Sequence, residues 1–193
     1  MENEFYALMS RMRFITRWGL MRNTFPENVQ EHSHQVAVLA HGLALIRRKI
    51  LHLEGPDPDK CAVAALYHDA SEILTGDLPT PIKYYNRDIK TAYKKVEWVA
   101  GQRLLDMLPQ ELRGAYEHLV LEDDLEVLPI VKAADKLSAY IKCLEEQKAG
   151  NREFDAAEAQ IHKALVELDL PELNWFMDHC MEAFSASLDQ LDT

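Results

Sequence analysis

Residues 62–72, AVAALYHDASE, place three ionisable side chains on an otherwise apolar, helix-forming stretch. On one helix His68 and Asp69 are neighbours about 100° apart, and Glu72 follows one turn further on, so all three can face a single site. A buried charge is costly unless it is paired or binds a metal. The sequence therefore predicts that this helix meets ionisable partners from elsewhere in the chain.

Two partners of the required chemical type lie on other predicted helices. His32 falls in the first turn of an early helix, and Asp135 lies on a later apolar helix. With His68 and Asp69 they offer two imidazoles and two carboxylates to one divalent cation. Such donors suit zinc, cobalt, manganese, iron or nickel better than calcium. Each residue alone has an ordinary explanation, as a solvated histidine or a surface ion pair, so the prediction rests on their combination.

The same part of the sequence indicates how many metal ions bind and which side chains could transfer protons. A second metal would need further histidines between His68 and Asp135, and His118 alone lies there, on a different predicted helix. One metal ion is therefore expected. Glu72 can orient or deprotonate a water as general base. Asp77 can protonate the departing oxygen, hold the substrate or simply cap the turn at Pro79, and the sequence does not separate these roles.

The bulk composition limits the class of protein. The chain has 193 residues, 48% of them hydrophobic, which is enough for one domain and short for two, so residues 1–193 are predicted to form a single domain. Three widely spaced cysteines without a CxxC pair favour reduced thiols in a cytoplasmic protein. The first five residues lack the basic segment and apolar run of a signal peptide, and the longest apolar run, residues 61–67, is too short to cross a membrane, so no membrane association is expected.

The formal net charge of −11 at pH 7 argues against a nucleic-acid polymer as partner. A small phosphate ester remains compatible, because a metal and a few placed cations can overcome the overall field locally. Arg17, Arg22 and Lys83 are the candidate cations. Arg17 with Trp18 is either a surface cation beside a buried indole, or a guanidinium that holds phosphate while the indole covers a base or sugar.

Apolar periodicity and helix caps predict an all-α protein, without the alternating pattern of β-hairpins. Asn28 and Glu31 have capping-box spacing, which places His32 in the first turn of its helix. Residues 75–81, TGDLPTP, form a stiff loop of the kind that often carries substrate contacts. We expect a helix at residues 4–14, a second that begins at residue 28 and has apolar residues on one face as far as Ile46, and a third that begins at residue 57 or 59 and includes His68 and Asp69. Further helices are expected at residues 86–108, 110–121, 129–148, 155–168 and 171–188.

The order of these motifs, an early histidine, then His-Asp and then a lone aspartate, resembles the HD-domain superfamily of metal-dependent phosphohydrolases. The similarity is closer to the bacterial HD-domain 5′-deoxynucleotidases and extends over nearly the whole chain. It rests on RW at 17–18, EHS at 31–33, YHDASE at 67–72, TGDLPTP at 75–81 with KY at 83–84, AD at 134–135 and YIKCLEE at 140–146.

This resemblance implies a helical bundle of the HD-domain type that hydrolyses deoxyribonucleoside 5′-monophosphates to deoxynucleoside and phosphate. It implies a homodimer and one divalent cation, with cobalt expected in vitro and manganese, zinc or others as alternatives. The implied metal ligands are His32, His68, Asp69 and Asp135. Arg17 would orient the phosphate, Trp18 would line the sugar, and Asp77, Leu78, Pro79 and Thr80 would complete the pocket.

Two other functions are compatible with the same residues. Another HD-type hydrolase could release triphosphate from a deoxynucleotide, although the chain lacks obvious extra basic segments for a triphosphate. A metal- and nucleotide-binding sensor without turnover has no need of a base at the metal, which Glu72 would provide. Release of phosphate from a deoxynucleoside monophosphate would distinguish among the three.

Overall fold

Helices form the regular secondary structure of this protein, as the sequence predicts. The computed structural model describes residues 3–83 and 85–191, without the side chains of Thr80 and Pro81. Within this part of the chain there is no β-strand, and a single isolated bridge pairs Thr16 with Asn28 in antiparallel fashion. The all-α prediction is therefore confirmed.

The elements follow one another with short connections. The α-helices are α1 (Phe5–Met9), α2 (Val29–Leu45), α3 (Pro58–Tyr67), α4 (Glu72–Thr75), α5 (Thr80–Lys83), α6 (Arg87–Asp106), α7 (Gln110–Leu121), α8 (Leu128–Lys148), α9 (Asp155–Leu168) and α10 (Pro171–Phe184). A π-helical turn, η2 (Ile46–Ile50), extends α2, and the 3₁₀ turns are η1 (Met12–Phe14), η3 (Arg152–Phe154) and η4 (Leu188–Gln190).

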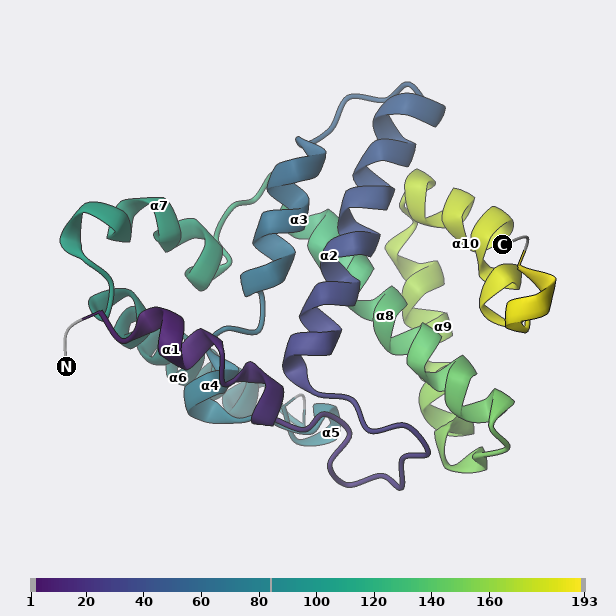
Figure 1. Ribbon diagram of the computed structural model, residues 1–193, viewed down its shortest axis with the longest axis horizontal. Helices are drawn as coiled ribbons and strands as arrows, with labels where there is room; N and C mark the ends of the chain where they lie inside the picture. The colour runs from purple at the N-terminus through teal and green to yellow at the C-terminus, as the bar shows by residue number, and fades with distance from the viewer. Residues whose placement is uncertain (1–2, 84, 192–193) are drawn as a thin grey trace.

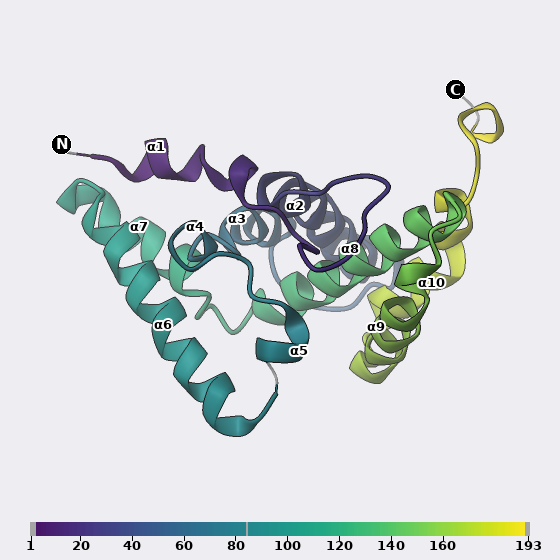
Figure 2. The same ribbon diagram turned by 90° about the horizontal axis from the view of Figure 1, so that it is seen from below.

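The helices are arranged around α2, α3 and α8, which pack on one another at the centre of the molecule (Figure 1). On one side α9 and α10 pack against α8. On the other side α6 and α7 form a helical hairpin, with α1 lying along it (Figure 2). The central helices therefore have neighbours on both sides.

Two clusters of buried apolar side chains hold this arrangement together. The larger one joins α2, α3, α8, α9 and α10 through fully buried residues such as Leu43, Leu137 and Ile141. The smaller one joins α1, α6 and α7 through Phe5 and Leu104. On α10, Phe176 is buried in the larger cluster, and Trp175, Met177 and Phe184 pack against it while remaining partly exposed.

The helix starts follow the caps that the sequence predicts. Asn28 and Glu31 form a capping box at the start of α2, with Glu31 N–H donating to Asn28 Oδ1 at 3.0 Å. Asn86 caps α6 by accepting from Ile89 N–H, and Asp57 caps α3 by accepting from Asp59 and Lys60 N–H. These caps satisfy backbone N–H groups that have no partner within the helix.

The ends of the first and the last helix differ from the prediction. The first helix stops at Met9 instead of residue 14, because Ser10 Oγ donates to Ala7 O and the chain continues into the 3₁₀ turn η1. The last helix stops at Phe184 instead of residue 188. Phe5, Leu8, Met9 and Met12 nevertheless all face the interior, as their spacing predicts. No described helix has the length and apolar character needed to cross a lipid bilayer.

The C-terminal half of α8 binds the loop of residues 18–26. Glu146 is fully buried and accepts hydrogen bonds from Thr24 N at 2.8 Å and from Phe25 N at 3.0 Å. Lys142, one turn earlier, donates both to Glu146 and to Phe25 O. Burial alone would raise the pKa of Glu146, but the hydrogen bonds outweigh it and lower the pKa to about 2. A buried carboxylate therefore fixes this loop to α8.

We predict that Glu146→Gln lowers the free energy of unfolding at pH 7 by about 3–5 kcal/mol, because it breaks a buried ion pair. The pKa of about 2 in the folded state lies below the usual value of 4.5. The stabilisation by Glu146 is thus complete above pH 4.5 and is lost as pH falls through about 2. Urea unfolding at pH 7, 5, 3 and 2 should show the gap between wild type and variant closing with acid.

The control for this measurement is Glu167→Gln, which removes an exposed carboxylate 3.8 Å from Lys163. This change should alter stability by less than about 1 kcal/mol. Equal losses for the two variants, or a gap that stays constant with pH, would contradict the assignment of a buried ion pair to Glu146.

Candidate metal site and substrate pocket

The helix that leads to His68 ends earlier than the sequence predicts. α3 stops at Tyr67, residues 68–71 form a turn, and Glu72 begins the separate short helix α4. The prediction that His68, Asp69 and Glu72 share one continuous helix is therefore wrong. The cause is local, because His68 Nδ1 lies 2.7 Å from Ala65 O, the carbonyl that Asp69 N–H would use in a continuing helix.

The turn nevertheless brings His68 and Asp69 to the predicted partners on α2 and α8. His32 Nε2 lies 3.1 Å from Asp135 Oδ1 and 3.6 Å from Asp69 Oδ2. His68 Nε2 lies 3.1 Å from Asp69 Oδ2 and 4.0 Å from Asp135 Oδ1. One ligand atom each from His32, His68 and Asp135 fall within 4.8 Å of one another, so these three residues could hold a metal ion.

In each imidazole, the partner of Nδ1 determines whether Nε2 of the neutral ring carries a lone pair. Ser138 Oγ donates to Gln35 Oε1 and lies 3.1 Å from His32 Nδ1, so it accepts from that nitrogen. His68 Nδ1 faces a carbonyl, which can only accept. Both Nε2 atoms of the neutral rings therefore carry lone pairs, and buried His68 Nε2 has no hydrogen-bond partner among the described residues. Lone pairs that face carboxylates fit a cation between them.

The electrostatics of the site also favour a cation. Burial opposes a charge on His68, but Asp69 and Asp135 outweigh it and raise the pKa of His68 to about 10. Burial likewise opposes ionisation of Asp69 and Asp135, yet the histidines hold the pKa of Asp69 well below its usual range and lower that of Asp135 to about 2. The four side chains thus stabilise positive charge, whether a proton or a metal ion carries it.

Arg17 and Trp18 lie beside this group and share one acceptor. Arg17 Nη1 donates to Asp69 Oδ2 at 3.4 Å, and Arg17 Nε donates to Glu27 Oε2 at 3.1 Å. Trp18 Nε1 donates to the same Glu27 oxygen at 2.9 Å, while its ring lies 5.3 Å from that of Phe154. Burial disfavours the charge on Arg17, but the surrounding carboxylates raise its pKa further, so the guanidinium stays charged.

The other two candidate cations, Arg22 and Lys83, contact glutamates that are not predicted site residues. Arg22 is almost fully exposed and forms an ion pair with Glu153 at 3.3 Å. Lys83 lies 2.7 Å from Glu97 of α6 and over the ring of Tyr93. Of the three, Arg17 is the one whose described contacts reach a predicted metal ligand.

Glu72 and Asp77 are acidic side chains with raised pKa values near this group. Glu72 is buried, and its Oε2 has no hydrogen-bond partner in the described part of the chain. Burial and the neighbouring Asp69 and Asp77 raise the pKa of Glu72 to about 9, against the opposing effects of Arg17 and Lys83. Burial also raises the pKa of Asp77, while Arg17 acts in the opposite direction.

The proline-rich loop is shorter than predicted. It begins at Gly76, which has a positive φ of 73°, and it ends at Pro79, because Thr80 begins the short helix α5. Asp77, Leu78 and Pro79 are half-buried. The predicted pocket residue Thr80 has its side chain outside the described part of the structure.

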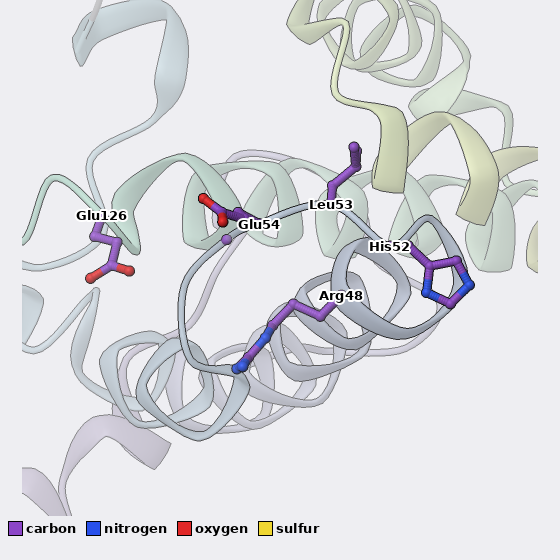
Figure 3. Close-up of a pocket in the computed structure, with 6 residues that line it drawn as sticks. Arg48, His52, Leu53, Glu54 and Glu126 are labelled. Carbon is purple, nitrogen blue, oxygen red and sulfur yellow. The ribbon is translucent and has the colours of Figure 1, made fainter.

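The structure has a small hollow beside His68 and an open hollow at the far end of α2 from His32. His118 lies with His68 and Glu122 on a small hollow between α3 and α7, where it is largely exposed and pairs with Asp123 at 2.6 Å. An open hollow after η2, lined by Arg48, His52, Leu53, Glu54, Gly55 and Glu126, contains none of the predicted site residues (Figure 3). Within the described residues, His118 is not part of the group that could hold a metal.

Sequence reasoning did not identify two residues that contact the site. Ser138 can be predicted from its spacing, because a small polar residue three positions after Asp135 lies on the same face of an apolar helix. No sequence pattern indicates Glu27, because its contact with Arg17 depends on the bridge between Thr16 and Asn28.

Comparison with solved structures identifies the fold class. An HD-domain phosphohydrolase from Listeria innocua superposes with a TM-score of 0.81 over 96% of this chain and 90% of that one, at 20% identity. A cyanophage S-2L HD phosphohydrolase, solved with dA and one catalytic Zn²⁺ ion, superposes with a TM-score of 0.64 over 92% and 96% of the two chains, also at 20% identity. The chain therefore has the fold of HD-domain phosphohydrolases.

Sequence comparison narrows this class to one family. The model of the 5′-deoxynucleotidase YfbR-like family matches residues 4–184. A 5′-deoxynucleotidase of Erwinia tasmaniensis is 50% identical over 98% of this chain and 96% of its own length, and one of Vibrio vulnificus is 46% identical over 98% of each. This protein belongs to the 5′-deoxynucleotidase YfbR-like family.

We predict that Ser138→Ala weakens metal binding by about 10–100-fold, because it removes the acceptor that fixes the His32 tautomer. His32→Ala should abolish binding at this site. Titration of metal-stripped protein with Co²⁺, followed by calorimetry, measures both effects. His34→Ala is the matched control, since His34 is exposed two residues away on the same helix and should leave the affinity unchanged. Equal affinity of Ser138→Ala and wild type would contradict the tautomer assignment.

Proposed function

We propose that this protein hydrolyses deoxyribonucleoside 5′-monophosphates to deoxynucleoside and phosphate, using one divalent cation held by His32, His68, Asp69 and Asp135. The observation that carries this proposal is the position of Arg17, whose guanidinium contacts the predicted ligand Asp69 while Trp18 follows it in the chain. A cation for phosphate beside a metal site, with an aromatic ring next to it, matches the groups of a nucleoside monophosphate. Family membership supports the same substrate class.

A divalent ion at the metal site would act as the Lewis acid of the reaction. A bound divalent ion polarises a phosphoryl oxygen and lowers the pKa of water. We propose cobalt as the effective ion in vitro, with manganese, zinc and others as alternatives, because nitrogen and carboxylate donors suit all of them. Two aspartates balance the charge of such an ion, so Arg17 provides the further positive charge that phosphate requires.

Glu72 is proposed as the general base that takes a proton from the attacking water. Its buried carboxyl lacks a partner on Oε2 within the described residues, which leaves that atom available to a water. A divalent cation next to Asp69 would counter the raised pKa of Glu72 and favour its ionised form. Asp77 either protonates the departing 5′ oxygen or holds the sugar.

The remaining pocket residues are assigned to the nucleoside. Trp18 is proposed to pack against C2′ of the sugar, so that a ribose hydroxyl would be buried without a partner. Leu78, Pro79 and Thr80 are proposed to complete the pocket wall. The alternative of a triphosphohydrolase is less well supported, because Arg22 and Lys83 pair with Glu153 and Glu97. A binding sensor would have no need of Glu72.

We further propose that residues 1–193 act as one domain, that the protein is a homodimer, and that it works in the cytoplasm. The placement of the metal ligands on α2, on the turn after α3 and on α8 supports a single domain. Trp98 and Val99 on α6 are more than half exposed and offer apolar area for a second copy. Free thiols at Cys61, Cys143 and Cys180 are typical of a reducing compartment.

Phosphate release from matched deoxyribo- and ribonucleoside 5′-monophosphates tests the proposed activity. Metal-stripped protein should be inactive, and cobalt should restore turnover of the deoxy series. Trp18→Ala should lower the deoxy-to-ribo ratio of kcat/KM by up to about 100-fold, because it opens space at C2′. Trp98→Ala, an exposed indole on α6, is the control and should keep the wild-type ratio. Equal loss of activity on both sugars in Trp18→Ala would contradict the assigned role.

The proposed base is tested with Glu72→Gln, which keeps the size of the side chain and removes its basicity. We expect kcat to fall by at least about 100-fold while cobalt affinity stays close to that of wild type. Single-turnover phosphate release and calorimetry measure the two quantities. A variant that retains wild-type kcat would remove Glu72 from the proton transfer.

A further inference from the structure

Glu27 makes two contacts that no proposed catalytic role uses. Its Oε2 atom accepts from Arg17 Nε at 3.1 Å and from Trp18 Nε1 at 2.9 Å. The side chain of Glu27 is 11% exposed, so this acceptor is largely shielded from water. One carboxylate oxygen therefore joins the guanidinium proposed for phosphate to the indole proposed for the sugar.

The backbone places this oxygen opposite both donors. Arg17 N–H donates to Glu27 O at 3.0 Å, Val29 N–H donates to Ile15 O at 2.9 Å, and Thr16 pairs with Asn28 between them. Asn28 also caps α2, the helix that carries His32 in its first turn. The position of Glu27 is thus tied to the helix of a predicted metal ligand.

Trp18 depends on such side-chain contacts because its backbone is unfavourable. Its φ of 57° lies in the left-handed region, which is costly for a residue with a side chain. The indole is held by Glu27 at Nε1 and lies against Phe154. Arg17 likewise has one short contact, to Glu27, and one longer contact of 3.4 Å to Asp69. Removal of Glu27 would leave both side chains with fewer restraints.

We propose that Glu27 is a positioning residue that fixes Arg17 and Trp18 relative to each other and thereby sets the preference for deoxyribose. This inference rests on the proposed function. The charge of Glu27 matters as well as its shape, since one oxygen accepts from two donors and a charged acceptor binds them more strongly than an amide. Glutamine in its place retains one acceptor oxygen and adds an N–H₂ group that cannot accept from either donor.

The first test is the selectivity of Glu27→Gln. We expect its deoxy-to-ribo ratio of kcat/KM to fall by about 10–100-fold, because small displacements of positioning groups have effects of this size. Cobalt affinity should stay close to wild type, and the variant should remain folded at the assay temperature because Arg17 keeps its contact with Asp69. Glu31→Gln is the matched control, as it removes an exposed carboxylate four residues away, in the first turn of α2, and glutamine still fits the capping box. An unchanged ratio in Glu27→Gln, or the same fall in Glu31→Gln, would overturn the proposal.

A double-mutant comparison shows whether Glu27 acts through Trp18. In a Trp18→Ala background, Glu27→Gln should lower the ratio no further, because the indole that Glu27 positions is already absent. Trp18→Phe removes the N–H donor and keeps an aromatic ring, so it should also lower the ratio while the protein stays folded. Additive effects of Glu27→Gln and Trp18→Ala would overturn the proposal.

A fluorescence measurement separates this proposal from the proposed function. In a Trp98→Phe, Trp175→Phe background the emission reports Trp18 alone, and Glu27→Gln should increase its quenching by acrylamide. Increased quenching in a protein that releases no phosphate from deoxynucleotides would support the positioning by Glu27 and reject the proposed substrate. Unchanged quenching together with normal deoxynucleotidase activity would reject the role of Glu27 alone.

Discussion

The close approach of two imidazole nitrogens to the carboxylates of Asp69 and Asp135 is the interaction on which the rest of the site depends, because it favours a cation among them. Ser138 and the carbonyl of Ala65 take the second nitrogen of each ring, which leaves both lone pairs directed at the carboxylates. These groups come from α2, α8 and the turn after α3, so the site exists only when these elements pack correctly. The large apolar cluster between them provides that packing.

The balance of charge among the groups of the proposed metal site also accounts for the position of Arg17. A divalent ion and two aspartates nearly balance, so attraction of a phosphate group depends on a separate cation. Arg17 is the buried cation at this position, although the chain as a whole is strongly acidic. Glu27 offsets part of the charge of Arg17 and orients it at the same time. The carboxylates around the site thus favour a cation, and Arg17 is the positive side chain that contacts them directly.

Much of the fold could be predicted from local signals in the sequence. Caps such as Asn28 and Asn86 marked helix starts, because a side chain that accepts from its own backbone acts within a few residues. The end of α3 could not be predicted, because the competition for Ala65 O depends on the orientation of the His68 ring. Glu27 was missed for a similar reason, since its partners are set by pairing between two loop segments. The orientation of one side chain decided the first case, and pairing between two distant segments decided the second.

One face of α8 connects the metal group to the loop of residues 18–26. Asp135, Ser138, Lys142 and Glu146 follow at helical spacing, so Asp135 and Glu146 lie about 16 Å apart along one rigid helix. The distance between Asp135 and the loop that carries Trp18 is thereby set by the backbone of a helix. Residues within the loop can change without moving Asp135, so under the proposed function sugar preference can evolve separately from hydrolysis.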